Sequence, residues 1–178
     1  MRKAYRYRLY PSKSQVSLLE QTLEICRWVY NDTLALRKNA WEQEQHSISL
    51  YETNKILTQW KKERPDLNQV HSQVLQNVQM RVDLAFKAFF RRVKAGEKEP
   101  GFPRFKGKGR YDSFTYPQSG FKLEGDRLHL SKIGDVRVVL HRPIEGTIKT
   151  LTIRRSSTGK WYACFSVECD PFPVPQKE

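Results

Sequence analysis

The residues best suited to chemistry lie between residues 101 and 111, where basic and aromatic side chains alternate with glycines. The basic members are Arg104, Lys106, Lys108 and Arg110, and the aromatic members are Phe102, Phe105 and Tyr111. Lysine and arginine neutralise phosphates, and aromatic rings offer faces on which unstacked bases can lie. The glycines prevent a helix and let the backbone approach a partner closely. This stretch therefore predicts a loop that grips nucleic acid; the alternative is a solvated, flexible loop.

Positive charge is concentrated in two short regions of the chain. The 178 residues carry a formal net charge of +13, of which residues 1–11 hold +4 and residues 72–111 hold +7. A basic balance of this kind suits nucleic acid or an acidic membrane surface. No run approaches the length of a membrane span, and the basic N-terminus lacks the apolar region of a signal peptide. We therefore expect a nucleic-acid partner and no membrane.

Patterns for catalysis or metal binding are not found in the sequence. The four histidines are isolated, without metal-binding spacing, and the three cysteines form no C-x-x-C pair. The acidic residues after residue 111 mostly flank turns or strand edges. We predict no catalytic residue, no metal site and no cofactor in this chain. An enzyme with an unrecognised site in the β region is a competing hypothesis.

Helical periodicity dominates the sequence before the basic stretch. Ser12 opens a capping box, and apolar residues at three- and four-residue steps predict a helix from residue 12 into the low forties. A second capping box at Ser49 begins a shorter helix. Ser72 is a good N-cap for a third helix, and Gly96 suits its C′ position. Three or four antiparallel helices would form a small bundle.

Strand periodicity opens the chain and returns after residue 111. Residues 2–10 alternate, which places Tyr5, Tyr7 and Leu9 on a buried face and the arginines between them on the other face. Short strands with tight turns over residues 112–169 suggest a small barrel. A lone strand cannot form a sheet, so the first strand should pair with the later ones.

The predicted fold class is therefore α+β, a small antiparallel, OB-like β-barrel interrupted by an inserted helical bundle. We assign residues 1–11 and 112–169 to the barrel and residues 12–111 to the bundle, which ends in the basic loop at residues 97–111. The proline-rich residues 170–178 are typical of an extended linker or tail.

Further binding candidates lie on the helices. Amides cluster with Ser72 at the start of the third helix, where they could pair with adenine edges and the helix N-terminus would favour phosphate; Tyr51 could join them. The alternative is that these are ordinary surface residues. Arg27 and Arg37 lie off the apolar stripe of the first helix, where solvated charges are expected. The predicted nucleic-acid-binding residues are Arg6, Arg8, Arg27, Tyr51, Ser72, Gln73, Gln76, Arg81, Arg91, Arg92, Phe102, Arg104, Phe105, Lys106, Lys108, Arg110, Tyr111, Arg154 and Arg155.

Several short motifs resemble those of the OrfB/TnpB family of insertion-sequence, transposase-associated proteins, which is related to the type V CRISPR effectors. They keep the order and spacing of the family's N-terminal half. The motifs are Tyr7–Pro11, Cys26–Asn31, Ser72–Gln76, Ala85–Arg91, Gly101–Lys106, and Ile153–Arg155 with Trp161–Tyr162.

The resemblance implies a wedge barrel interrupted by a helical recognition domain, in a family of RNA-guided DNA endonucleases acting in transposition. Its partners would be DNA and a guide RNA. By the same resemblance, Tyr51, Ser72, Gln73 and Gln76 match positions that face the motif beside the target. Arg104, Lys106 and the basic residues of the barrel would face RNA or heteroduplex backbone.

The family's RuvC-like nuclease domain, with its divalent metal and zinc, has no counterpart in these residues. The expectation is a truncated or split, non-catalytic protein, with a separate nuclease polypeptide as a possible partner, in a prokaryotic cytoplasm near the nucleoid. The alternative is an autonomous helix-turn-helix DNA-binding repressor that needs no guide RNA.

Overall fold

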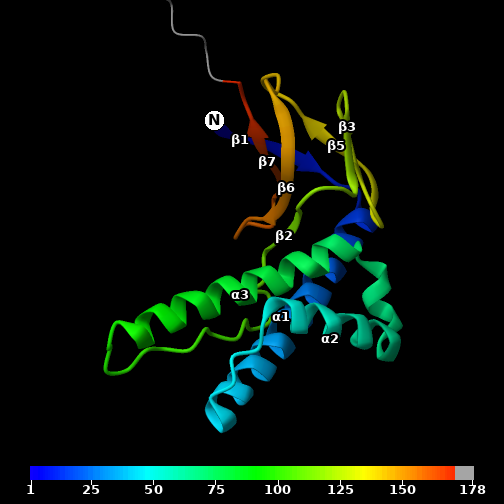
Figure 1. Cartoon of the computed structure of the whole chain (residues 1–178). Helices are drawn as coiled ribbons and strands as arrows, with labels where there is room; N and C mark the ends of the chain where they lie inside the picture. Colours follow the sequence, from blue (N-terminus) through cyan, green and yellow to red (C-terminus); the bar gives the residue numbers. More distant parts are fainter. Residues whose placement is uncertain (171–178) are drawn as a thin grey trace, which may run out of the picture.

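The computed structural model describes residues 1–170 and shows a β-sheet standing on a group of helices (Figure 1). In chain order the elements are β1 (Arg2–Tyr10), α1 (Lys13–Glu44), α2 (Leu50–Glu63), the 3₁₀ helix η1 (Pro65–Gln69), α3 (Ser72–Lys94), β2 (Ser113–Tyr116), β3 (Phe121–Glu124), β4 (Arg127–Leu130), β5 (Gly134–Val139), β6 (Thr147–Arg155) and β7 (Trp161–Glu168). The predicted tail lies outside the described residues from residue 171 onward.

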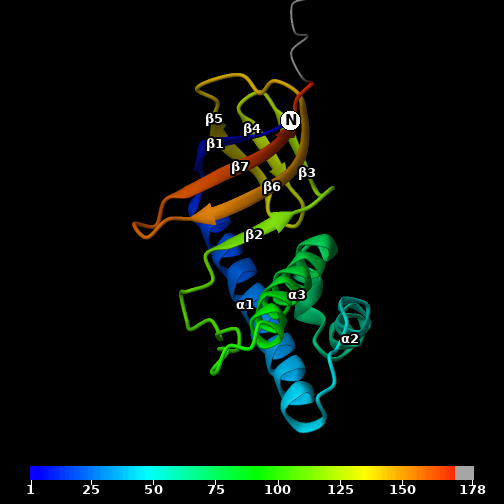
Figure 2. The ribbon, with the colours of Figure 1, turned by 60° about the vertical axis from the view of Figure 1, so that its left-hand side comes forward.

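The first strand lies in the middle of the sheet. Within residues 1–170 the sheet has the order β2-β6-β7-β1-β5-β4-β3, and every pairing is antiparallel. It curls into a nearly closed barrel (Figure 2). Tyr5, Tyr7 and Leu9 point inward and are at most 4% exposed. The predicted α+β class, with a small antiparallel barrel interrupted by helices, is confirmed.

The helix ends follow the capping chemistry of the sequence with one correction. Ser12 and Ser49 both close complete capping boxes. Gly96 has a φ of +79°, and the amides after α3 bond back to Val93 and Arg92 as in a Schellman motif. Ser72 as N-cap was wrong: it is the first helical residue, and the capping position belongs to His71, which makes no side-chain capping bond.

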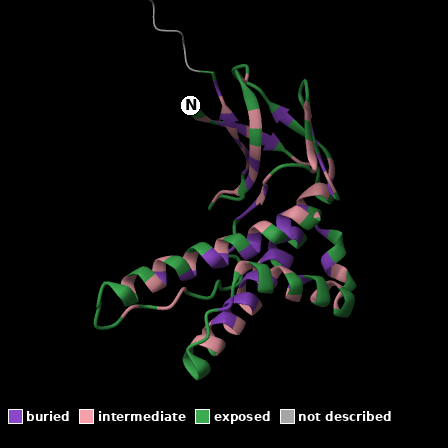
Figure 3. Ribbon diagram, viewed as in Figure 1, coloured by how far each residue is buried: buried purple, intermediate pink, exposed green. Residues whose placement is uncertain are grey.

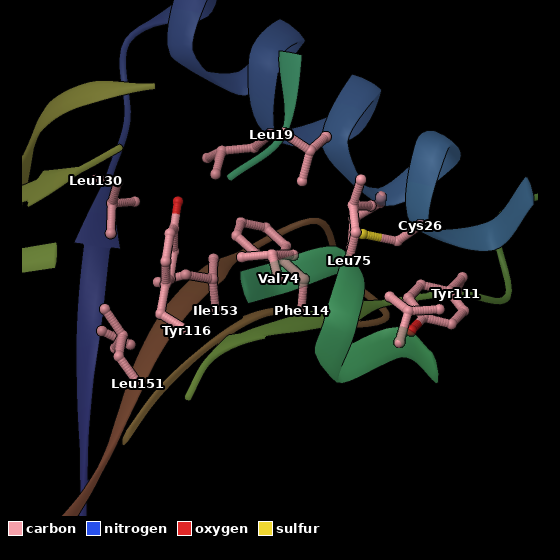
Figure 4. Close-up of a cluster of buried hydrophobic side chains, with 14 of the residues drawn as sticks. Leu19, Cys26, Val74, Leu75, Tyr111, Phe114, Tyr116, Leu130, Leu151 and Ile153 are labelled. Atoms are coloured by element: carbon pink, nitrogen blue, oxygen red, sulfur yellow. The ribbon is translucent and has the colours of Figure 1, made fainter. Parts of the chain in front are cut away.

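A continuous hydrophobic core joins the helices to the open end of the barrel. Leu19 and Cys26 of α1 and Leu75 of α3 meet Phe114 and Ile153 of the sheet (Figure 4). Buried residues likewise run along the facing sides of α1 and α3 and up the inside of the strands (Figure 3). Burial of this apolar surface fixes the helices against the barrel.

One charge inside the helices contradicts the sequence-based expectation. Arg37 is 4% exposed, and its guanidinium donates to Asp83 of α3 at 2.9 Å while lying 4.9 Å from the ring centroid of Phe86. It is therefore a buried ion pair and not a solvated charge. The correction arises because Arg37 follows Thr33 and Leu34 at the three- and four-residue spacing of the buried side of α1.

Candidate nucleic-acid interface

The basic loop is docked onto α1. The side chain of Asn31 makes two bonds to the backbone of Lys106, donating to its carbonyl at 2.9 Å and accepting from its amide at 2.8 Å. Arg27 donates to the same carbonyl at 3.1 Å. Farther along, Arg155 of β6 donates to the carbonyl of Gly109 at 3.3 Å. These ties hold residues 106–109 in one place and leave the side chains of the loop at the surface.

Two of the three loop aromatics are not available to bases. Phe102 stacks on Phe89 of α3, with ring centroids 4.4 Å apart. Tyr111 is 5% exposed, and its burial raises the pKa of its hydroxyl. Phe105 is 51% exposed. The prediction that all three rings offer open faces was therefore wrong for Tyr111 and Phe102, which anchor the loop, and Phe105 alone of the three has an open ring.

Arg81 ties α3 to the first strand after the loop. Its guanidinium donates to the hydroxyl of Tyr111 at 3.1 Å, the carbonyl of Ser113 at 2.8 Å and the hydroxyl of Thr115 at 3.0 Å. A half-buried arginine with three such bonds is oriented by the protein itself. Its charge still reaches the nearby surface, but its first function here is to position the junction of helix and barrel.

Two neighbouring hollows lie at this junction, and basic side chains line both. One, of about 270 Å³, is bordered by Lys106, Arg110 and Arg154. The other, of about 500 Å³, is bordered by Arg110, Arg155 and the turn between β6 and β7. Arg110 and Asp112 belong to both walls. The loop and the barrel, distant in sequence, thus present their charges to a single concave surface.

The same surface continues over the outer face of the barrel. Arg154, Tyr162 and Arg8 are direct cross-strand partners on β6, β7 and β1. The guanidinium of Arg6 lies 3.9 Å from the ring centroid of Tyr162, and that of Arg8 lies 5.7 Å from it. Tyr10 and Arg137 extend the face onto β5. The name basic junction surface is used below for the two hollows together with Arg6, Arg8, Tyr10, Arg137, Arg154 and Tyr162.

Sequence reasoning missed Tyr162, Tyr10 and Arg137 on this surface. The alternation along β7 placed Tyr162 opposite its inward residues, so it could have been recognised as an outward-facing ring. The register that stacks it with arginines of another segment was not readable from local sequence, because β1 and β7 are about 160 residues apart.

The amides at the start of α3 form a separate group. Ser72 and Gln76 are exposed. The side-chain carbonyl of Gln73 accepts from the amide of Ser119 at 3.0 Å and from its hydroxyl at 2.9 Å, which ties α3 to the loop between β2 and β3. Gln73 therefore has a structural bond in addition to any binding role.

Tyr51 belongs to a different helix from this group. It lies at the start of α2, two residues before Thr53, whose carbonyl accepts a bond from Gln79 in the first half of α3. From there α2 runs back toward the start of α3 (Figure 1). Its ring is 68% exposed, with the ammonium of Lys55 4.5 Å from its centroid.

The remaining candidates lie toward the far end of α3. Arg91 is exposed, and Arg92 donates to the carbonyl of Gly101 at 2.8 Å, which holds the start of the loop to the helix. Arg104 and Lys108 are exposed along the returning loop, and Lys108 lies where that loop reaches the basic junction surface, near Arg155 and Glu24. The predicted residues thus divide among the basic junction surface, the start of α3, Tyr51 on α2 and the end of α3.

Residues 1–170 were also searched for metal sites and membrane-spanning helices. Across these residues no cluster of three or more histidine, cysteine or acidic side chains could hold a metal ion. Among the helices of the same part of the chain, none is long and apolar enough to cross a membrane. What the described geometry offers chemically is a barrel with an inserted bundle whose seam presents oriented guanidinium and ammonium groups to a polyanion.

Comparison with known proteins supports this class. A family model described as a helix-turn-helix domain, of the OrfB IS605 type, matches residues 1–46. The chain is 31% identical over 181 residues to a "Putative RNA-guided DNA endonuclease" of Streptomyces pristinaespiralis. It is 33% identical over 171 residues to the "Putative RNA-guided DNA endonuclease InsQ" of Escherichia coli (strain K12). The alignments cover 98% and 94% of this chain.

These matches confirm the resemblance to the OrfB/TnpB family along nearly the whole chain. The chain spans 44% and 40% of the lengths of the two relatives. Its fold is similar to that of a chain in a cryo-EM structure of the Cas12f1-sgRNA-target DNA complex, with a TM-score of 0.52, 8% identity, and coverage of 96% of this chain and 49% of that one. At this identity the likeness concerns the fold alone.

Proposed function

We propose that this chain is the nucleic-acid-binding part of a TnpB-like system, holding a guide RNA and its DNA target without cleaving them. The basic junction surface carries the proposal, because it assembles charges from the loop and from the outer barrel face on one side of the molecule. Both relatives bear the name of RNA-guided DNA endonucleases, which favours RNA and DNA as the ligands.

The cleavage chemistry is assigned elsewhere in this proposal. Phosphodiester hydrolysis by a two-metal site needs converging carboxylates, and residues 1–170 present no acidic cluster able to hold a metal. The binding role requires no cofactor of this chain. A nuclease domain, on a separate polypeptide or in a longer chain, would act on the nucleic acid that this part holds, in a prokaryotic cytoplasm near the nucleoid.

The test begins with RNA that co-purifies with the protein. Sequencing that RNA, then measuring duplex binding with and without it, should show RNA-dependent binding. Tight binding to one symmetric duplex site without RNA would instead support the autonomous repressor.

Charge reversal locates the surface. A triple variant with glutamate at Lys106, Lys108 and Arg110 should weaken RNA binding strongly and flatten its salt dependence. The matched control places glutamate at the exposed Lys13, Lys62 and Lys149, which lie outside the basic junction surface. Equal losses in both variants would refute the assignment of the surface, because only overall charge would then matter.

A further inference from the structure

A second concave site lies on the opposite flank of Arg27 from the barrel. The cavity has a volume of about 360 Å³ and lies between α1 and the start of η1. Trp28 and Asp32, one turn apart on α1, form one wall, and Arg64 and Asp66 form the other. None of these four residues belongs to the basic junction surface, and the segment that contains them, residues 12–71, has no net charge.

One wall of the cavity is an oriented guanidinium platform. Arg64 lies 4.0 Å from the ring centroid of Trp28. Its edge donates to Asp66 through two bonds, of 3.2 and 2.7 Å, which fix the plane of the guanidinium. Trp28 is supported in turn by Trp60, edge to face at 5.2 Å. Arginine planes of this kind stack with unpaired nucleobases, and the side chain of Arg64 remains 36% exposed.

The other wall holds the carboxylate of Asp32, which makes no hydrogen bond and no ion pair within residues 1–170. Burial raises the pKa of Asp32, and the nearby charge of Arg64 opposes this shift. A carboxylate would repel a phosphate but accepts two parallel hydrogen bonds. Guanine presents two adjacent donors, N1–H and the 2-amino group, on its Watson–Crick edge. Adenine and cytosine present one amino donor beside an acceptor, and uracil presents one N–H between two carbonyls.

The cavity also borders the path expected for a nucleic-acid backbone. Arg27 lines it and donates to the carbonyl of Lys106 in the basic loop. A strand whose phosphates lie along the loop would therefore pass its rim. Beyond Gln21 and Ile25 a second hollow, of about 290 Å³, continues the groove to Lys132.

We propose that this cavity binds an unpaired guanine of a single-stranded nucleic acid, which stacks on Arg64 and pairs its Watson–Crick edge with Asp32. This inference rests on the proposed nucleic-acid-binding function and adds a base preference to it. The basic junction surface holds phosphates whatever the sequence, and the cavity selects the base.

The test compares short uridine oligonucleotides that carry one central guanine, hypoxanthine, adenine or cytosine, by fluorescence anisotropy with the full chain. Bidentate base contacts discriminate by about 1–3 kcal/mol, so guanine should bind about 5- to 150-fold more tightly than adenine or cytosine. Hypoxanthine, which lacks the 2-amino group, should fall between them. Asp32→Asn should remove the difference in affinity between the guanine oligonucleotide and the adenine and cytosine oligonucleotides.

The controls separate the base pocket from the phosphate surface. Asp126→Asn makes the same charge change at the exposed turn between β3 and β4 and should keep the guanine preference. Oligonucleotide binding without a guanine preference, or with one that survives in Asp32→Asn, would overturn the pocket and spare the proposed function. A chain that binds none of the oligonucleotides would overturn both.

Discussion

The two bonds between Asn31 and the backbone of Lys106 allow the geometry of the basic loop to be tested separately from its charge. Asn31→Ala removes both bonds without changing the net charge. A typical hydrogen bond contributes about 0.5–1.5 kcal/mol net. Because Arg27 still bonds the carbonyl of Lys106, we expect the variant to lose about 1–2 kcal/mol of the free energy that holds the loop on α1. If that energy holds the loop in its binding position, affinity should fall about 5- to 30-fold.

The salt dependence distinguishes this effect from a loss of charge. In Asn31→Ala the loop keeps every basic side chain that can neutralise a phosphate, so the slope of log K against log salt should equal that of the wild type. Alanine at Lys106, Lys108 and Arg110 together should instead make the slope shallower by about two to three, at roughly 0.7–0.9 for each phosphate that the variant leaves unneutralised.

The assay is RNA binding measured by anisotropy between 50 and 300 mM salt, about the range over which counterion release dominates. The exposed Asn39→Ala on the same helix is the control and should leave both affinity and slope unchanged. Wild-type affinity in Asn31→Ala would refute the reasoning, since docking of the loop on α1 would then contribute nothing to binding.

Three further predictions concern stability, measured by circular dichroism. Asp83→Ala leaves Arg37 buried without its partner and should cost about 3–5 kcal/mol of unfolding free energy, whereas Arg37→Met combined with Asp83→Leu should cost far less; equal losses would contradict the buried pair. The pKa of His71 lies below its ordinary value of 6.5 because of burial, with Lys132 and Lys61 adding to the effect, so its neutral form stabilises the fold above pH 6.5. That contribution should be lost as the pH falls from 6.5 through the lowered folded-state pKa, and His71→Gln should remove this part of the pH dependence of the melting temperature; an unchanged slope would contradict it. Gly120→Ala places a methyl group 2.8 Å from the His71 ring and 2.9 Å from the Tyr116 ring at a φ of +95°, and should cost more than Gly159→Ala, where φ is +80° and the space is open; equal melting temperatures would contradict the close approach.

The elements were largely predictable because their signals are local. Capping boxes at Ser12 and Ser49 and alternation in residues 2–10 each depend on a few neighbouring residues, and the structure places elements where these signals predict them. The pairing of the first strand with later ones followed from the instability of a lone strand, and β1 indeed lies between β5 and β7.

The site was less predictable because side-chain roles depend on distant partners. Arg37 was expected to be a solvated charge, yet it pairs with Asp83. Arg81 was expected to bind nucleic acid, yet it donates to residues 30 to 34 positions away in the chain. Tyr111 was predicted to offer its ring to bases, but its side chain is buried and its hydroxyl accepts a bond from Arg81 of α3. Residue type and spacing thus located the basic loop, and only the tertiary structure separates its anchoring side chains from its exposed ones.

The helix-turn-helix description of residues 1–46 does not match how those residues fold here, and this bears on how nucleic acid could be bound. The matched segment forms β1 and the single long helix α1. One side of α1 packs on α3, a second side holds the basic loop through Asn31, and a third lines the cavity with Arg64. A helix-turn-helix places a second, recognition helix in the major groove, and residues 1–46 contain a single helix. In the proposed function, binding therefore depends on a surface assembled across the seam of bundle and barrel, and the uncharged bonds of Asn31 to the backbone of Lys106 hold the loop of that surface in place.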